Sequence, residues 1–399
     1  MTNLTLSKNI VDTGHEAFTS MLNLSSMEIL TAKMDTLPLM TDCRSLSKIT
    51  AIDGPTVIPT SFLEGLILVK EFRIPSTIKE INDFAFRLTS ISTINIPASV
   101  IGITEGALRD IQIDELTVAE GNSVYHMENG ALFQTNHRTL ITRVDTTESY
   151  TIDKDVTAIY AYAFANHGSM KKLFFEDNED GVNIGVGAFF SCTNLEEVKL
   201  PNNLVTIPDG DFCADLSLKK FTIPATVQTI GIEALSFSNQ TAINRINIPA
   251  AVTNIGNTAF YASLIDTIDV SWLTPLHLEY DANNQPVFNP KYISNMTLLV
   301  PQGTFAAYKA ADQWKDFGTI VEKKITDLKE TKSIDDILKV SVVNDAMILT
   351  TEEPRNVRIV NLAGQTEYTA TVNRTVTVSV PNGVHIVQVG NTAIKVIVP

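Results

Sequence analysis

The chain contains several copies of one short apolar segment, and this repetition limits its fold more than any other feature. INIPAAVTNIGNTAF begins at residue 246, FTIPATVQTIGIEAL at 221, INIPASVIGITEGAL at 94 and FRIPSTIKEINDFAF at 72. Two neighbouring copies place their prolines 22 residues apart, at Pro75 and Pro97, and two others 25 apart, at Pro224 and Pro249. A period of this length is typical of solenoid proteins, in which each copy forms one coil.

The residues within one copy indicate how the coil is built. Ile246–Ile248 alternates apolar and polar residues as a short strand does. Pro249 then ends the strand, because proline has no N–H to donate to a neighbouring strand. Val252 and Ile255 line the next side of the coil, and Phe260 fills its interior. One coil cannot bury these side chains alone, so we predict a stack of coils with parallel strands on one face over residues 1–325.

Two segments depart from the repeat. Residues 122–144 interrupt it and contain Asn129-Gly130, the strongest short hairpin signal, followed by alternating apolar residues. We therefore expect a β-hairpin or a small meander that projects from the solenoid. Residues 298–325 carry large aromatic side chains, among them Trp314, on a stretch with helical character. Such a segment is expected to cap the open end of the coil stack.

The composition changes after the repeats. Residues 326–336 are polar and predict a linker, and residues 337–399 hold six or seven short, β-branched segments separated by turn residues. This pattern predicts a small antiparallel β-sandwich. The whole chain is therefore expected to be a repeat solenoid followed by a small antiparallel β-sandwich domain.

The repeat resembles a known family. The IP-x-x-V-x-x-I-x-x-x-AF unit, the N-x-x-Y-x-x-x-NGALF insert and the VPQG…Y…W closing segment are similar to the BspA-like leucine-rich repeat family over residues 1–325. BspA-like proteins are surface or secreted proteins of anaerobic, often host-associated bacteria, and some are adhesins for host matrix proteins or other microbes. The resemblance implies an extracellular or cell-surface location. The first residues, MTNLTLSKNI, lack the basic and apolar regions of a signal peptide, so we expect that an export signal has been removed.

The C-terminal part resembles a second group of domains. NVRIVNLAGQ and VPNGVHIVQVGNTAIKVIV are similar to the β-sandwich tails that address Bacteroidota proteins to the type IX secretion system. The resemblance implies a sorting role. The alternative is a related domain that is kept as a structural end-module.

Charge and residue usage exclude several classes of partner and chemistry. The formal net charge is −15, which argues against nucleic acid or anionic lipid as a partner. No run approaches the roughly 20 apolar residues of a membrane helix, so we expect no membrane insertion. Cys43 and Cys192 occupy the same place in the repeat and are predicted to lie in the core.

The sequence offers no recognisable catalytic or metal site. The histidines form no HExxH pattern, and we expect His126, His137 and His167 to be exposed to solvent. The acidic loop at residues 177–181 lacks the ligand spacing of a calcium loop. We therefore expect a protein that is not an enzyme and that holds no metal or cofactor.

The exposed rows of the strand face hold the candidate binding residues. Residues that flank the inward apolar position of each strand point outward. On successive coils these rows place basic side chains around one aromatic residue that we expect to be exposed: Lys172, Phe174, Lys199, Lys220 and Arg245. Such a patch suits an acidic protein segment or a sulfated or carboxylated glycan. The alternative is an ordinary solvated sheet face, in which Glu197 partly neutralises the lysines.

Three functions follow from these observations. The first is a non-catalytic, secreted or cell-surface binding protein, adhesin-like, that engages a protein or acidic glycan through the solenoid face. The second is an architectural component of a cell-surface assembly without a soluble ligand. The third, a glycan- or peptide-acting hydrolase, needs a pair of carboxylates in a cleft, and the sequence singles out no such pair.

Overall fold

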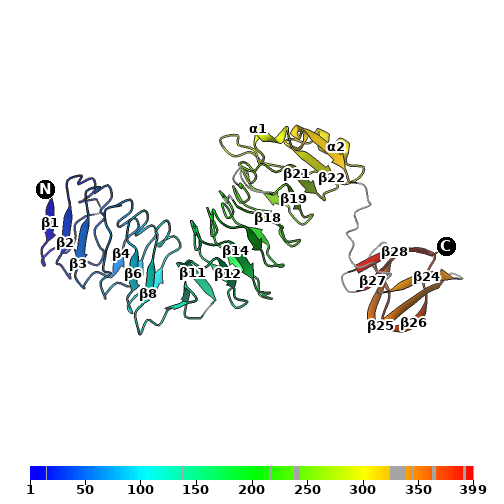
Figure 1. Cartoon of the computed structure of the whole chain (residues 1–399), viewed down its shortest axis with the longest axis horizontal. Helices are drawn as coiled ribbons and strands as arrows, with labels where there is room; N and C mark the ends of the chain where they lie inside the picture. The colour runs from blue at the N-terminus through cyan, green and yellow to red at the C-terminus, as the bar shows by residue number, and fades with distance from the viewer. Residues whose placement is uncertain are drawn as a thin grey trace. The chain divides into compact units, whose positions relative to one another are not determined.

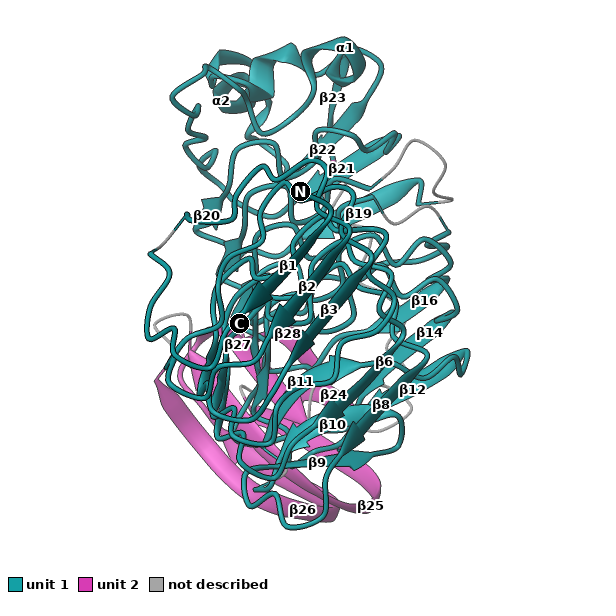
Figure 2. Ribbon diagram, turned by 90° about the vertical axis from the view of Figure 1, so that its left-hand side faces the viewer, with its two compact units in different colours: residues 1–322 teal, residues 323–399 magenta. Residues whose placement is uncertain are grey.

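The computed structural model describes residues 1–14, 16–136, 138–214, 217–237, 243–323, 338–343, 346–361, 365–389 and 392–398. The chain divides into two compact units, Met1–Glu322 and Lys323–Pro399, which Figure 2 shows in different colours. The predicted linker at 326–336 and the predicted exposure of His137 lie outside the described residues.

The first unit is the predicted solenoid, with one strand of up to four residues from most coils on the same face (Figure 1). Neighbouring strands pair in parallel and in register, as at Ile246 opposite Ile268. The strands of this face are β1 (Asn3–Leu6), β2 (Ser26–Ile29), β3 (Lys48–Ala51), β6 (Thr93–Ile96), β8 (Glu115–Val118), β12 (Ser149–Ile152), β14 (Lys172–Phe175), β16 (Glu197–Lys199), β19 (Arg245–Ile248), β21 (Thr267–Val270), β22 (Thr297–Val300) and β23 (Thr319–Glu322).

A second series of parallel strands follows the proline turn of the coils. Each is only two residues long and ends in the isoleucine that the repeat pattern assigns to this side. The members are β4 (Val57–Ile58), β5 (Glu80–Ile81), β7 (Gly102–Ile103), β13 (Ala158–Ile159), β15 (Asn183–Ile184), β17 (Thr206–Ile207), β18 (Thr229–Ile230) and β20 (Asn254–Ile255). Two residues are too few to produce an alternating pattern, so the sequence predicts the side of the coil but not this strand.

Phenylalanine rings from the repeat form the axis of the core. Phe164, Phe189 and Phe212 are all buried, with ring centroids 5.3 and 5.5 Å apart from one coil to the next. The predicted core positions of Cys43 and Cys192 are confirmed, since both are fully buried. Each thiol donates to a backbone carbonyl, that of Cys43 to Phe18 at 2.9 Å and that of Cys192 to Phe164 at 3.1 Å.

The insert forms an antiparallel meander of β9 (Tyr125–Glu128), β10 (Ala131–Gln134) and β11 (Thr139–Arg143). The expectation that it projects from the solenoid is wrong. Strand β11 pairs in parallel with β13, and both faces of the meander are buried. Leu132 packs into the core of the preceding coils, whereas Phe133 packs into the core of the following coils. Alternate residues of a strand point to opposite faces, and here both faces are apolar.

The end of the solenoid carries α1 (Pro290–Ile293), α2 (Phe305–Ala310) and the 3₁₀ helix Trp314–Asp316. Trp314 is fully buried, and its indole N–H donates to the carbonyl of Leu276 at 2.7 Å. The hydroxyl of Tyr308 donates to the carbonyl of Trp272 at 2.9 Å. These aromatic side chains cover the last coils. No helix among the described residues is long and apolar enough to span a bilayer.

The second unit is a five-stranded antiparallel sheet around its own core. Its strands are β24 (Lys339–Val343), β25 (Ala346–Asn361), β26 (Thr366–Ser379), β27 (Gly383–Val389) and β28 (Thr392–Val398). The pairing of β25 with β26 shifts between Thr351 and Arg355, and residues from both sides of the shift, such as Leu349 and Ile359, enter one core. The predicted fold class, a repeat solenoid followed by a small antiparallel β-sandwich domain, is confirmed in its solenoid and in its C-terminal antiparallel sheet.

Candidate binding surface

The strand face of the coils after the meander carries two rows of outward side chains in strict register. Lys172 lies opposite Glu197, and the backbone of Glu197 pairs in an isolated parallel β-bridge with that of Lys220 on the next coil. In the second row Phe174 lies between Thr151 and Lys199. Backbone bonds from Lys172 N to Glu148 O at 2.9 Å and from Glu197 N to Lys171 O at 3.1 Å hold this ladder closed. We call Lys172, Phe174, Lys199 and Lys220 the basic ladder.

Arg245 does not belong to the basic ladder. Its strand, β19, pairs with β21, and among the described residues no backbone bond joins it to the coil of Lys220. The Arg245 guanidinium forms an ion pair with Asp269, whose side chain is only 7% exposed. The charge of Arg245 is therefore partly compensated by Asp269, and the strand face shows no backbone pairing that would continue the basic ladder to Arg245 within the described residues.

The aromatic residue of the patch is also less exposed than predicted. Phe174 is half-buried. Neighbouring parallel strands are about 4.8 Å apart, so the side chains of Thr151 and Lys199 flank the ring on both sides. Phe174 thus offers only part of its ring surface to a partner.

Carboxylates alternate with the lysines along this face. The Nζ of Lys172 lies 4.0 Å from Glu197, that of Lys171 lies 2.5 Å from Glu148, and that of Lys219 lies 2.5 Å from Glu196. The hydrogen bond from Lys219 lowers the pKa of the Glu196 carboxyl, and the charges of Lys219, Lys171 and Lys172 lower it further. Lys199 and Lys220 are exposed and form no ion pair within the described ranges, so they supply the uncompensated positive charge.

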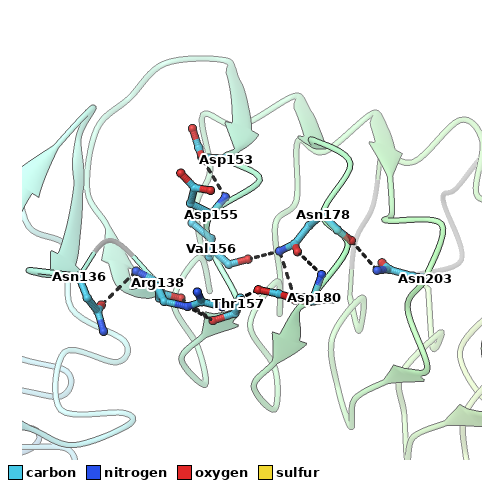
Figure 3. A network of polar contacts seen from close by, with 10 residues as sticks. Asn136, Arg138, Asp153, Asp155, Val156, Thr157, Asn178, Asp180 and Asn203 are labelled. Atoms are coloured by element: carbon cyan, nitrogen blue, oxygen red, sulfur yellow. Dashed lines mark hydrogen bonds and ion pairs between the residues drawn. The ribbon is translucent and has the colours of Figure 1, made fainter.

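The polar groups that the sequence offers for metal or acid–base chemistry are engaged in structure. In the acidic loop, Asp180 accepts from Arg138 at 2.8 Å, and the amide of Asn178 donates to the carbonyl of Val156 at 2.9 Å (Figure 3). On the next coil, the amide of Asn203 donates back to the carbonyl of Asn178 (Figure 3). The loop therefore joins neighbouring coils to the meander. Across the part of the chain that the structure describes, no three His, Cys, Asp or Glu side chains are placed to hold a metal ion.

Two histidines are less exposed than expected. His126 is half-buried and stacks on Phe133 with ring centroids 5.9 Å apart. His167 is also half-buried; burial lowers its pKa, and the nearby charge of Arg143 lowers it further. Both residues pack at the meander, because the meander is an internal layer and not a projection.

A buried ion pair fixes the meander to the strand face. The Arg143 side chain is fully buried, forms an ion pair with Asp145, and lies over the Tyr150 ring with its guanidinium carbon 4.5 Å from the centroid. Its Nη2 donates to the carbonyl of Thr147 at 2.9 Å. Burial raises the pKa of Tyr150 to about 12, so this ring stays neutral.

The strand face before the meander contains a hollow that the sequence analysis did not predict. The hollow has a volume of about 1040 Å³ and is lined by most residues of the segments 70–76 and 90–98 and by Ala119. No strand forms at residues 71–74, although FRIP matches the repeat as well as INIP does. We call this hollow the open groove.

Comparison with known proteins agrees with this architecture. A family model described as the BspA type leucine-rich repeat region matches residues 39–149 and 142–266 with six copies of the repeat, which is more than half of the chain. No curated protein matches the chain.

Two solved structures are similar in fold. The pneumococcal vaccine antigen PcpA is 19% identical, with a TM-score of 0.62 over 81% of this chain and 89% of that one. A leucine-rich cell-surface protein from Faecalibacterium prausnitzii is 20% identical, with a TM-score of 0.58 over 68% of this chain and 79% of that one. At this level of identity the likeness concerns the fold alone.

Proposed function

Because the chain belongs to the BspA-type leucine-rich repeat family, we propose that it is a non-catalytic binding protein of the cell surface or the extracellular space. A solenoid offers an extended regular face rather than a catalytic cleft, and such faces serve as binding surfaces. One similar structure is that of a leucine-rich cell-surface protein, which supports the proposed location.

The basic ladder is proposed as the binding site, and its partner as an acidic protein segment or a sulfated or carboxylated glycan. The observation that carries this proposal is the pair Lys199 and Lys220, two exposed cations without an ion pair in the described part of an otherwise acidic chain. An acidic partner neutralises this charge, whereas the half-buried ring of Phe174 adds a small apolar contact.

The test is a binding array of extracellular-matrix proteins and of sulfated and carboxylated glycans at two salt concentrations. The variant Lys199→Glu with Lys220→Glu is compared with the intact chain. Lys8→Glu with Lys33→Glu is the matched control, because it makes the same change of net charge on exposed lysines of the first coils. The proposal predicts binding that weakens with salt, disappears in the ladder variant and persists in the control.

Binding that survives the ladder variant would remove the basic ladder from the proposal. No binding to any array member by a folded chain would favour an architectural role.

The C-terminal domain is proposed to serve export, on the resemblance of its sequence to type IX sorting tails. That role stays a prediction, tested by whether the mature protein recovered from cells retains residues 338–398.

A further inference from the structure

The parallel ladder of the strand face is interrupted before the meander. In a closed part of the ladder, the first residues of each strand donate to the preceding coil, as Glu115 N does to Ser92 O at 3.0 Å and Lys48 N to Ser25 O at 3.3 Å. No corresponding bond joins residues 71–74 to β3 or to β6 within the described residues. Strand β6 therefore pairs on one side only, with β8.

The register of β6 shows which of its backbone groups remain open. Glu115 N donates to Ser92 O, and Ala119 N donates to Ile96 O at 2.8 Å, so these carbonyls face β8. Successive residues of a strand direct their backbone groups to opposite sides. The N–H and C=O groups of Thr93 and Asn95 consequently face the segment at 71–74, and no hydrogen bond to them from that side is present among the described residues.

The open groove lies at this unpaired edge. Thr93 and Asn95 are among its lining residues, together with the hydroxyl side chains of Ser90 and Ser92. Its volume of about 1040 Å³ is at the upper end of the roughly 300–1,000 Å³ that ligand pockets enclose. An open strand edge beside a groove of this size is the arrangement in which an extended peptide adds as a further strand.

The charge of the groove selects the kind of peptide. Lys70 and Arg73 line it and are exposed, and neither forms an ion pair within the described ranges. Glu71 is the one carboxylate among the lining residues. The lining therefore carries one net positive charge on a chain whose net charge is −15. Outside the lining, hydrogen bonds from Ser76 lower the pKa of the Asp53 carboxyl, and the charge of Arg73 helps to lower it.

We propose that the open groove binds an extended peptide segment with acidic side chains, which pairs with Thr93 and Asn95 of β6 through its backbone and with Lys70 and Arg73 through its carboxylates. Backbone pairing supplies affinity without regard to sequence, and the two cations select for acidic residues. This site lies on the coils before the meander and is separate from the basic ladder.

The probe is the fluorescein-labelled peptide Thr-Glu-Val-Glu-Val-Thr, titrated with the intact chain by fluorescence anisotropy. Two matched probes separate the contributions. Thr-Lys-Val-Lys-Val-Thr reverses the charge, and a version of the acidic peptide with N-methylated alternate amides removes the backbone donors. We expect both to bind at least about tenfold more weakly, the change that corresponds to about 1.4 kcal/mol.

Variants of the chain locate the site. Asn95→Pro removes the N–H on the open side of β6 and leaves the pairing with β8 intact, so it should weaken the acidic peptide about tenfold. Asn95→Ala controls for the lost side-chain bond to Thr117 and should change the affinity less than about threefold. Lys70→Glu with Arg73→Glu should abolish the preference for the acidic peptide, whereas Lys199→Glu with Lys220→Glu should not affect it.

Four outcomes would overturn the proposal. The first is equal binding of the acidic and N-methylated peptides, and the second is an affinity that Asn95→Pro leaves unchanged. The third is no peptide binding at 1 mM (about the weakest affinity worth detecting) by a chain that retains its native circular dichroism. The fourth is binding of a sulfated oligosaccharide, and of no peptide, in the open groove, which would assign the groove to glycans. Each result is independent of whether the basic ladder binds its own partner.

Discussion

Two regions of the strand face share one repeat pattern and differ in how their coils are joined. After the meander, β12, β14 and β16 form a closed ladder whose side chains stand in register. Before the meander, residues 71–74 leave β6 unpaired on one side, and a groove replaces the sheet. The closed region presents side chains only, whereas the open region also presents backbone groups. Ladder continuity, and not the repeat sequence, therefore decides which groups this solenoid face offers to a partner.

The meander separates the two regions, and its substitutions should have the largest effects. Phe133→Ala removes a side chain from the core of the later coils, and Leu132→Ala removes one from the core of the earlier coils. We expect losses of about 3–5 and 2–5 kcal/mol respectively in the free energy of unfolding. Amide exchange measured by mass spectrometry should rise mainly after the meander for the first and before it for the second. A rise on both sides in either variant would show that the two regions unfold as one.

Loss of the buried ion pair at the junction should have the next largest effect on the free energy of unfolding. Asp145→Ala leaves the fully buried Arg143 without its carboxylate, and we expect a loss of about 3 kcal/mol, measured by chemical denaturation. Burial opposes ionisation of Asp145, but hydrogen bonds from Arg143 and Thr147 bring its pKa below the usual range. The stabilisation is therefore present above the unfolded pKa and is lost as pH falls through the folded pKa. An equal effect of Asp145→Ala at pH 7 and at pH 2 would contradict this account.

One coil of the closed region carries a buried acid that its neighbours lack. Asp211 is fully buried at a position that is alanine in Ala188 and Ala234, and its Oδ2 has no hydrogen-bond partner within the described residues. Burial raises its pKa well above the usual range, whereas the bond from the Ala188 N–H lowers it in part. We expect Asp211→Ala to stabilise the protein by about 1–3 kcal/mol at neutral pH, measured by chemical denaturation.

The pH dependence of this gain has the opposite sign to that of Asp145. A carboxyl with a raised folded pKa contributes most favourably below its unfolded pKa, and the contribution is lost as pH rises through the folded pKa. The gain from Asp211→Ala should therefore shrink as pH is lowered. A gain that is constant with pH would mean that the acid is not protonated in the native state.

The smallest effect concerns binding at the basic ladder. Glu196→Gln removes a carboxylate that Lys219 and the neighbouring lysines partly neutralise. We expect an acidic partner of the ladder to bind about two- to fivefold more tightly at low salt, with little change at high salt. The affinity of the acidic hexapeptide for the open groove should not change. Surface plasmon resonance can measure both affinities on the same variant. An equal gain for both ligands would show a general charge effect and not two sites.

The repeat predicts much of this structure because its physics is local. Alternation at Ile246–Ile248 fixes which side chains are buried, and a constant period fixes which residues become neighbours, so the rows through Lys172 and Lys199 follow from the sequence alone. The cores of the coils, including Cys43 and Cys192, follow for the same reason.

The features that escaped prediction depend on contacts between coils. FRIP and INIP share the same order of apolar, polar and proline positions, so that order does not mark the missing strand at 71–74 or the open edge of β6. FTIP at 221–224 likewise forms no strand. Phe133 and Leu132 read as one alternating strand, but only the structure shows a core on both sides of it. Arg245 lies at the predicted start of its strand, but only the structure shows its ion pair with the nearly buried Asp269.

Residue-resolved amide exchange of the intact chain, by nuclear magnetic resonance, tests the contrast between the two regions most directly. Lys172 and Phe174 donate within the closed ladder, whereas Thr93 and Asn95 face the open groove. We predict slow exchange for the first pair and nearly unprotected exchange for the second, with Thr93 and Asn95 slowed when the acidic hexapeptide is added. Equal protection of all four amides, unchanged by the peptide, would show a ladder that is closed throughout and would contradict the account.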